Sequence, residues 1–270
     1  MITREQQFHD PPVNAFAALG RQVIGSLQGS GRGLLLLLGA IANVPHAFSR
    51  KNRADVMQQL YVVGIKSLGV VSVVGLFTGM ILALQMGLAL RIFGQEHMVS
   101  TLVCNGILRE MGPFMAGLVV AASVGSAIAA QMGTMTVSEE IAALDVMGIA
   151  PQRYLVMPRL VALAVMLPLL TVYMDLIGLL GGAIVGATML GVSPETYFDG
   201  VFRHTHNKDL YVGLLKAFIF GLIIVCVSCH QGFSTTEGAV GVGRATRRTV
   251  IVSFLLILML GYVVTRMAYR

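Results

Sequence analysis

Long apolar runs separated by short polar stretches set the pattern of this chain. Five runs stand out, at roughly residues 65–90, 99–132, 160–190, 211–230 and 250–267. A helix needs about 20 apolar residues to cross the hydrocarbon core of a bilayer, and most of the runs reach that length. The pattern therefore predicts an all-α, polytopic membrane protein with five transmembrane helices, in a membrane domain that covers residues 60–270.

Residues 13–47 precede the first run and have a different character. Arg21 and Arg32 interrupt them, and the uncharged part that remains is too short to cross the hydrocarbon core of a bilayer as a helix. We expect an amphipathic helix lying at the cytoplasmic membrane surface, after an N-terminal tail of residues 1–12. Basic residues at 50, 51 and 53 then mark the cytoplasmic side, so five spans would place the C-terminus on the opposite side.

A short amphipathic segment, residues 137–149, joins the second and third runs. Its acidic positions are Glu139, Glu140 and Asp145, and its apolar positions are Ile141, Leu144 and Met147. Gly148 and Pro151 close the segment, as expected for a helix end. Anionic lipid headgroups would repel these carboxylates, so a soluble protein partner suits the segment better than the membrane surface does.

Several residues inside the runs are unusual for lipid-facing helices. Arg109, Glu110 and Asp175 carry charge in apolar surroundings, where each charge costs about 2.5–3.5 kcal/mol at the bilayer centre and is usually functional. The pair Gly112-Pro113 predicts a break or kink in the second span. Small-residue ladders predict close helix contacts in the first and third spans, at Gly75, Gly79, Gly178, Gly182 and Gly186.

Composition agrees with the membrane assignment. Hydrophobic residues make up 56% of the 270 positions and charged residues 12%, against about 25% charged in soluble domains. The formal net charge is +6, but the basic residues lie at the ends of apolar runs rather than in a stripe with aromatics. Membrane topology explains them better than a nucleic-acid partner does, so no nucleic acid is expected.

Motifs for cofactors and catalysis lack the required context. None of the four lysines follows a glycine, so a phosphate-binding Walker A loop is absent. Cys226-Val-Ser-Cys229-His230 matches a haem-attachment pattern but lies at the predicted cytoplasmic end of the fourth span. His204, His206 and Asp209 are too loosely spaced to predict a metal site. We expect no cofactor, metal or catalytic residue in this chain, and therefore no enzyme.

Several motifs, in order along the chain, resemble those of the MlaE (YrbE) permease family. They are LREMGP (108–113), VGSAIAAQMGTM (124–135), EEIAALDVMGIAP (139–151), MPR (157–159), LPLLT (167–171) and GVGRATRRTV (241–250). The resemblance implies an ABC-transporter permease of the bacterial inner membrane that moves phospholipid or a related lipid between the inner and outer membranes. It also implies a homodimer with a periplasmic C-terminus.

The resemblance further implies partners. Two copies of a cytoplasmic ABC ATPase would bind ATP and Mg, a ring of MCE proteins would sit on the periplasmic side, and a STAS-domain subunit would join the ATPase. The ATPase would dock on a coupling helix that includes Glu139, Glu140, Ala143, Leu144, Asp145, Met147 and Gly148. Family analogy and amphipathicity place a lipid pocket at Phe77, Met80, Ile81, Leu84, Gln85, Arg109 and Glu110.

One departure from the family pattern stands out. Ser123 stands where the family has arginine, and Gln131 stands where it has glutamate. We interpret the joint absence of the two charges as the loss of an intramembrane ion pair. The alternative function is a stand-alone secondary transporter with a proton site at Asp175 or Glu110, although the sequence shows no inverted repeat of the kind many such transporters have.

Overall fold

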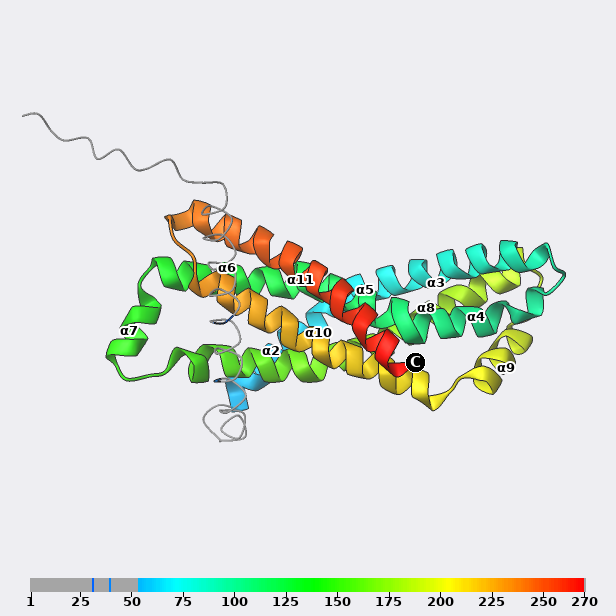
Figure 1. Cartoon of the computed structure of the whole chain (residues 1–270), viewed down its shortest axis with the longest axis horizontal. Coiled ribbons are helices and arrows are strands. Elements are labelled where there is room, and N and C mark those ends of the chain that lie inside the picture. Colours follow the sequence, from blue (N-terminus) through cyan, green and yellow to red (C-terminus); the bar gives the residue numbers. More distant parts are fainter. Residues whose placement is uncertain (1–30, 32–38, 40–52, 270) are drawn as a thin grey trace, which may run out of the picture.

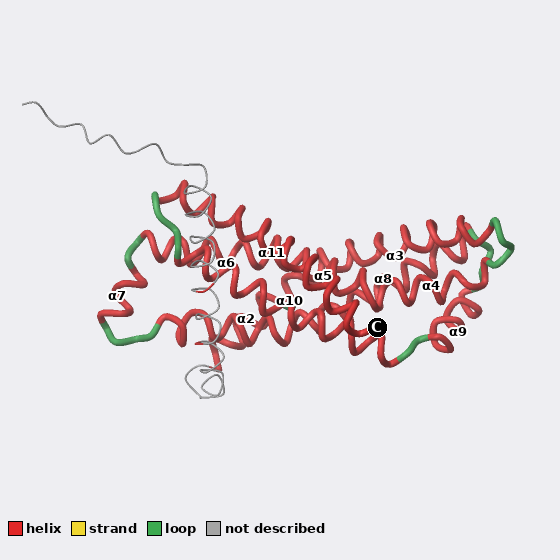
Figure 2. The backbone as a smooth tube through the Cα atoms, in the orientation of Figure 1, coloured by secondary structure: helices red, strands yellow, loops and turns green. Residues whose placement is uncertain are grey.

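The structure is a computed structural model that describes Gly31, Gly39 and residues 53–269. The predicted tail and surface helix, residues 1–12 and 13–47, lie outside the described residues apart from those two glycines. In residues 53–269 the regular structure is entirely helical, as predicted (Figure 2). The elements are α2 (Arg53–Val63), η2 (Ile65–Ser67), α3 (Leu68–Arg91), η3 (Glu96–Met98), α4 (Val99–Gly106), η4 (Ile107–Met111), α5 (Gly112–Val120), η5 (Ala121–Gly125), α6 (Ser126–Val137), α7 (Glu140–Val146), η6 (Gln152–Val156), α8 (Met157–Met189), α9 (Pro194–His204), α10 (Asn207–Phe233) and α11 (Gly238–Ala268).

The five predicted spans are confirmed as helices long and apolar enough to cross a membrane. They run over Arg53–Arg91, Val99–Val137, Gln152–Met189, Asn207–Phe233 and Gly238–Ala268. Several span ends differ from the sequence pattern. The fifth helix, for example, begins at Gly238 rather than near residue 250. The polar stretch after the third span contains α9, which starts where the Ser193 hydroxyl accepts a hydrogen bond from the Thr196 amide at 3.2 Å.

The helices form an elongated bundle with a surface helix at each end. Figure 1 shows α7 at one tip, while α9 and the turn between α3 and α4 lie at the other. The central helix is α8, which packs against α3, α10, α2 and α5, and α10 packs in turn against α11 and α6. Buried apolar side chains of α5, α6, α8 and α10 form the main core, which extends to α7, and a second core joins α3, α4, α8 and α9.

Glycines bring α3 and α8 into backbone contact, as the ladders predict. A Cβ atom at Gly79 would collide with the backbone of Gly178, and one at Gly75 would lie 3.2 Å from the Met174 carbonyl oxygen. Farther along α8, the space beside Gly182 is filled by the hydroxyl of Tyr197 from α9. Close approach of this kind supplies the dispersion contacts that hold helices together in lipid, where the hydrophobic effect gives little.

The Gly112-Pro113 pair produces a π-helical turn rather than a break. In η4 the Gly112 amide donates to the Ile107 carbonyl, five residues back, and the helix then continues as α5. Proline has no N–H, so the Arg109 carbonyl loses the donor that it would have in an α-helix. The π-turn absorbs the proline and leaves a backbone acceptor free for a partner from another helix.

Candidate functional site

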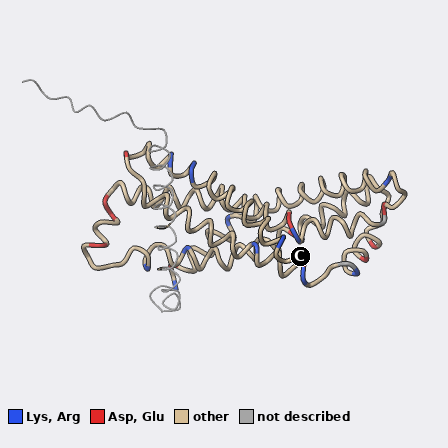
Figure 3. Tube along the Cα trace, viewed as in Figure 1, with Lys and Arg blue, Asp and Glu red and all other residues tan. Residues whose placement is uncertain are grey.

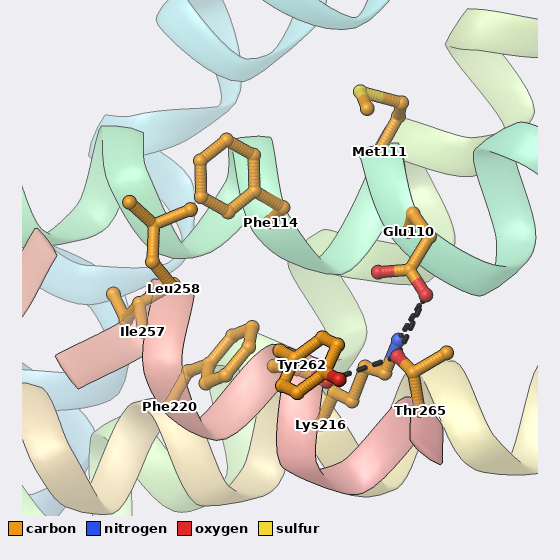
Figure 4. A pocket seen from close by; sticks show the side chains of 10 residues that line it. Glu110, Met111, Phe114, Lys216, Phe220, Ile257, Leu258, Tyr262 and Thr265 are labelled. Atoms are coloured by element: carbon orange, nitrogen blue, oxygen red, sulfur yellow. Dashed lines mark hydrogen bonds and ion pairs between the residues drawn. The ribbon is translucent and has the colours of Figure 1, made fainter. Parts of the chain in front are cut away.

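A cavity of about 320 Å³ lies between η4 and α5 of the second span and the helices α10 and α11. Aromatic and aliphatic side chains form most of its wall, and a small polar group closes one end (Figure 4). The lining residues are Glu110, Met111, Phe114, Lys216, Phe220, Ile257, Leu258, Gly261, Tyr262 and Thr265.

Lys216 organises the polar end of the cavity. Its side chain is 1% exposed, and its Nζ lies 2.9 Å from the Glu110 Oε1. The same ammonium group donates to the Arg109 carbonyl at 2.6 Å, the acceptor that Pro113 leaves free. The Thr265 hydroxyl donates to the Glu110 Oε1 at 2.7 Å. Burial of a lysine is tolerated here because its charge is paired and its protons have acceptors.

A second ion pair lies beside the first on η4 and α10. The Arg109 Nε lies 2.8 Å from the Asp209 Oδ1, and its Nη2 donates to Oδ2 at 2.9 Å. The Tyr269 hydroxyl donates to the Asp209 Oδ1 at 2.5 Å, and the Arg109 guanidinium lies 4.8 Å from the centre of the Tyr269 ring. Two cations and two carboxylates thus form a neutral network that ties η4 to α10 and to the end of the chain.

Tyr269→Phe tests whether the hydrogen bond between Tyr269 and Asp209 stabilises the fold. Partial burial and the hydrogen bond to Asp209 raise the pKa of Tyr269 to about 12. A raised pKa means that the stabilisation is complete below the ordinary tyrosine value of about 10 and is lost as the pH rises from 10 to 12. We expect the variant to lose about 1.5 kcal/mol of unfolding free energy at pH 8, the cost of a hydrogen bond to a charged group. Thermal unfolding in detergent measures this change.

Tyr262→Phe is the matched control on the same helix. The Tyr262 hydroxyl only accepts a 3.3 Å hydrogen bond from the exposed Arg266, so its removal should leave the stability unchanged. Equal melting temperatures for Tyr269→Phe and the wild type would contradict a tie through Asp209.

The structure brings together only part of the predicted lipid pocket. Arg109 and Glu110 lie at the polar end of the cavity. Met80 packs into the second core, whereas other predicted residues lie on an outer face of α3 that no other described element covers. These exposed residues are Phe77, Ile81, Leu84 and Gln85. Sequence reasoning missed Lys216 and Thr265, although a lysine inside the fourth apolar run was an available signal.

The predicted coupling helix is observed as α7, at the tip of the bundle between α6 and α8 (Figure 1). Ile141 and Leu144 pack against the main core, which fixes the orientation of the helix. The remaining predicted coupling residues are exposed: Glu139, Glu140, Ala143, Asp145, Met147 and Gly148. Val146 is 89% exposed, so the outer face is both acidic and apolar. Figure 3 shows acidic positions on this protruding segment.

The backbone turns sharply at both ends of α7. Glu139 has a φ of 61° and Gly148 a φ of 73°, both in the left-handed region. Glycine adopts this conformation at no steric cost, while a non-glycine residue does so at some cost in energy. The Ser138 hydroxyl also donates to the Glu140 carboxylate at 2.8 Å. These constraints hold α7 as a defined protrusion.

Gln131 has a different partner from the one inferred from the family pattern. Its Oε1 accepts a hydrogen bond from the Arg159 Nη2 at 2.9 Å. Ser123 is exposed, and its hydroxyl donates to the Val119 carbonyl of its own helix. An acidic residue at position 131 would therefore face Arg159, so the structure does not support a lost pair between positions 123 and 131.

Asp175 lies in the middle of α8 and is 4% exposed. Its Oδ1 has no hydrogen-bond partner within the described part of the chain, and it occupies the space where a Cβ atom at Gly112 would lie. The carboxyl group therefore packs against the second span next to the π-turn, on helices that meet only because residue 112 is glycine.

Five crossing helices, an apolar cavity with an internal ion pair and a protruding acidic helix define the membrane subunit of a transporter. The profile of the family described as Permease MlaE matches residues 56–267, so the chain belongs to this permease family.

Relatives with curated names agree with the family. A "Probable ABC transporter permease protein" of Rickettsia bellii is 36% identical over 96% of this chain and 99% of its own length. The "Intermembrane phospholipid transport system permease protein MlaE" of Haemophilus influenzae is 31% identical over 95% and 98%. The "Protein TRIGALACTOSYLDIACYLGLYCEROL 1, chloroplastic" of Arabidopsis thaliana is 33% identical over 80% of this chain and 62% of its own length.

The predicted class is thereby confirmed. The chain is a multi-pass inner-membrane protein and the lipid-transport permease subunit of an ABC transporter. It is not an enzyme, since ATP hydrolysis belongs to a separate partner. This assignment decides against the stand-alone secondary transporter.

Proposed function

We propose that the chain carries phospholipid between the inner and outer membranes, and that the cavity beside Glu110 and Lys216 receives the lipid headgroup. The supporting observation is a wall of Phe114, Phe220 and Ile257 that ends at an ion pair between a buried lysine and a half-buried glutamate. Acyl chains fit the apolar wall, while the ammonium group of Lys216 suits a phosphate. Glu110 would release Lys216 to the phosphate and pair with it again after the lipid leaves.

A single chain supplies only part of a lipid site. Ligand pockets measure about 300–1,000 Å³, and the cavity of about 320 Å³ is at the small end for a two-chain lipid. We propose that two copies form a homodimer that completes the site. In this arrangement the outer face of α3 would contribute Phe77, Ile81, Leu84 and Gln85, and Met80 would lie behind them in the second core.

The remaining partners follow from the same proposal. Two copies of the ATPase, each with ATP and Mg, would bind the α7 protrusions on the cytoplasmic side, together with a STAS-domain subunit. A ring of MCE proteins would face the opposite end of the bundle. The N-terminus would then be cytoplasmic and the C-terminus periplasmic. The acidic, partly apolar outer face of α7 supports docking of a protein with a basic groove.

Lipid transfer tests the proposed function. The complex purified with its ATPase is placed in vesicles of phosphatidylethanolamine and phosphatidylglycerol, with a fluorescent phosphatidylglycerol as probe. We expect ATP-dependent transfer of the probe to an acceptor and phospholipid in mass spectra of the complex. A complex that hydrolyses ATP without moving the probe or retaining phospholipid would contradict the proposal.

Glu140→Lys tests the docking role of α7. Reversing the charge of an exposed residue on the outer face should weaken retention of the ATPase about tenfold, because the lysine would meet a basic partner surface. Quantitative affinity purification of the tagged permease measures the retained ATPase. Glu195→Lys makes the same charge change on α9, at the other end of the bundle, and should leave retention unchanged. Equal retention for both variants would contradict docking on α7.

A further inference from the structure

Arg159 is a buried cation without a carboxylate partner in the described part of the chain. It lies at the start of α8, it is 4% exposed, and no acidic group lies within 4 Å of it among residues 53–269. Its guanidinium donates to the Leu155 carbonyl and, at 2.9 Å, to the Gln131 Oε1. Burying a charge that has only neutral acceptors is costly, and an apolar side chain would be cheaper here. The arginine therefore calls for an explanation other than stability.

The position of the hydrogen bond between Arg159 and Gln131 suggests such an explanation. Gln131 is on α6 and Arg159 is on α8, the two helices that flank α7. These helices hardly approach each other directly, because α10 packs against both of them. The hydrogen bond between Gln131 and Arg159 nevertheless joins α6 to α8 through their side chains. Figure 1 shows α7 protruding beyond α6 and the start of α8, the two helices that this bond joins.

Both flanking helices lead to the lipid cavity. From α6 the chain runs back through η5 and α5 to η4, which carries Glu110. From α7 the chain runs forward into α8, which packs against α5 and makes the glycine contact with α3. η5 is a second π-helical turn, and it lies between Gln131 and the cavity. If α6 and α8 could separate at the ends that flank α7, a movement of α7 would only change the distance between these two ends. It would then not move the helix segments that line the cavity.

We propose that the hydrogen bond between Arg159 and Gln131 is a strut that keeps the bases of α6 and α8 at a fixed separation. Arg159 is thus a positioning residue that couples ATP hydrolysis to lipid transfer. The inference rests on the proposed docking of the ATPase on α7. It goes further by naming the contact that passes the movement of α7 to both helices at once.

The test uses the complete complex in vesicles with the fluorescent phosphatidylglycerol probe. Gln131→Leu removes the acceptor and should lower the probe transferred per ATP hydrolysed by about tenfold, the equilibrium factor for one hydrogen bond to a charged group. ATPase retention and the rate of ATP hydrolysis should stay at wild-type values. Gln131→Glu keeps an acceptor facing Arg159 and should transfer at least as much probe per ATP as the wild type.

The matched control is Thr136→Val, on the same end of α6. The Thr136 hydroxyl donates to the Gly232 carbonyl of α10 at 3.2 Å, so this variant loses a helix-to-helix bond that does not reach α8. We expect a wild-type ratio of probe to ATP. An equal fall in the ratio for Thr136→Val and Gln131→Leu would overturn the strut, because it would indicate a general loosening of α6.

A double variant separates positioning from stability. Gln131→Leu with Arg159→Met replaces the whole pair by apolar side chains, which should restore any folded yield that Gln131→Leu loses. The strut predicts that the double variant folds, retains its ATPase and still transfers about tenfold less probe per ATP. A wild-type ratio in the double variant would overturn the inference. Loss of docking in Glu140→Lys is scored separately, by retention, so failure of the docking proposal and failure of the strut give different results.

Discussion

Gly79→Ala is expected to destabilise the folded protein by about 3 kcal/mol or more, the upper range for inserting a methyl group into a packed contact. The added Cβ would collide with the backbone of Gly178, not with a movable side chain. The two helices would have to separate, and the dispersion contacts that join them in lipid would be lost along the interface. Thermal unfolding and the yield of monodisperse protein in detergent measure the effect.

Gly69→Ala is the matched control on α3. Among the described residues, nothing lies within 4 Å of a Cβ atom at this position, so the methyl group has room there. Alanine is favoured over glycine in a helix by up to about 1 kcal/mol, so the control should be neutral or slightly stabilising. Similar losses for the two variants would mean that the backbone contact between α3 and α8 does not hold the bundle together.

The fold could be predicted largely because a lipid environment permits few backbone conformations. Backbone groups in a bilayer must bond within their own segment, so each apolar run implies a helix. Glycine spacing on two of these runs also predicts close helix contacts, although it does not say that α3 and α8 contact each other. Helix ends could not be predicted in the same way. A helix of 38 residues, Gln152–Met189, is about 57 Å long and extends well beyond the hydrocarbon core of about 30 Å, where hydropathy no longer marks it.

The candidate site could be predicted only in part. Arg109 and Glu110 are visible because they interrupt an apolar run, but their partners depend on how distant helices meet. Lys216 lies 106 positions from Glu110, and no local pattern links the two. Of the break or kink expected at Pro113, the break does not occur, for a related reason. The free carbonyl of Arg109 is satisfied by Lys216 from α10, so the helix need not end at the proline.

Lys216→Met is expected to abolish lipid transfer and to lower the unfolding free energy by about 1–3 kcal/mol, the cost of leaving a polar group without its hydrogen-bond partner. The cost stays in this range because Glu110, the charge left behind, is 44% exposed. The methionine fits the same space but offers no proton. The Arg109 carbonyl would lose its donor, and Glu110 would keep only the Thr265 hydroxyl. Thermal unfolding in detergent and transfer of the fluorescent phosphatidylglycerol probe measure the two effects. Lys66→Met, an exposed lysine of η2 that does not line the cavity, should change neither.

Loss of transfer in that variant could follow from instability alone, and Lys216→Met with Glu110→Gln removes this ambiguity. Without a carboxylate at position 110, no unpaired charge remains beside the methionine, so part of the lost stability should return. Transfer should not return, because the ammonium group that would receive the phosphate is still absent. Recovery of both stability and transfer would show that the ion pair only supports the fold, and that the lipid headgroup binds elsewhere in the complex.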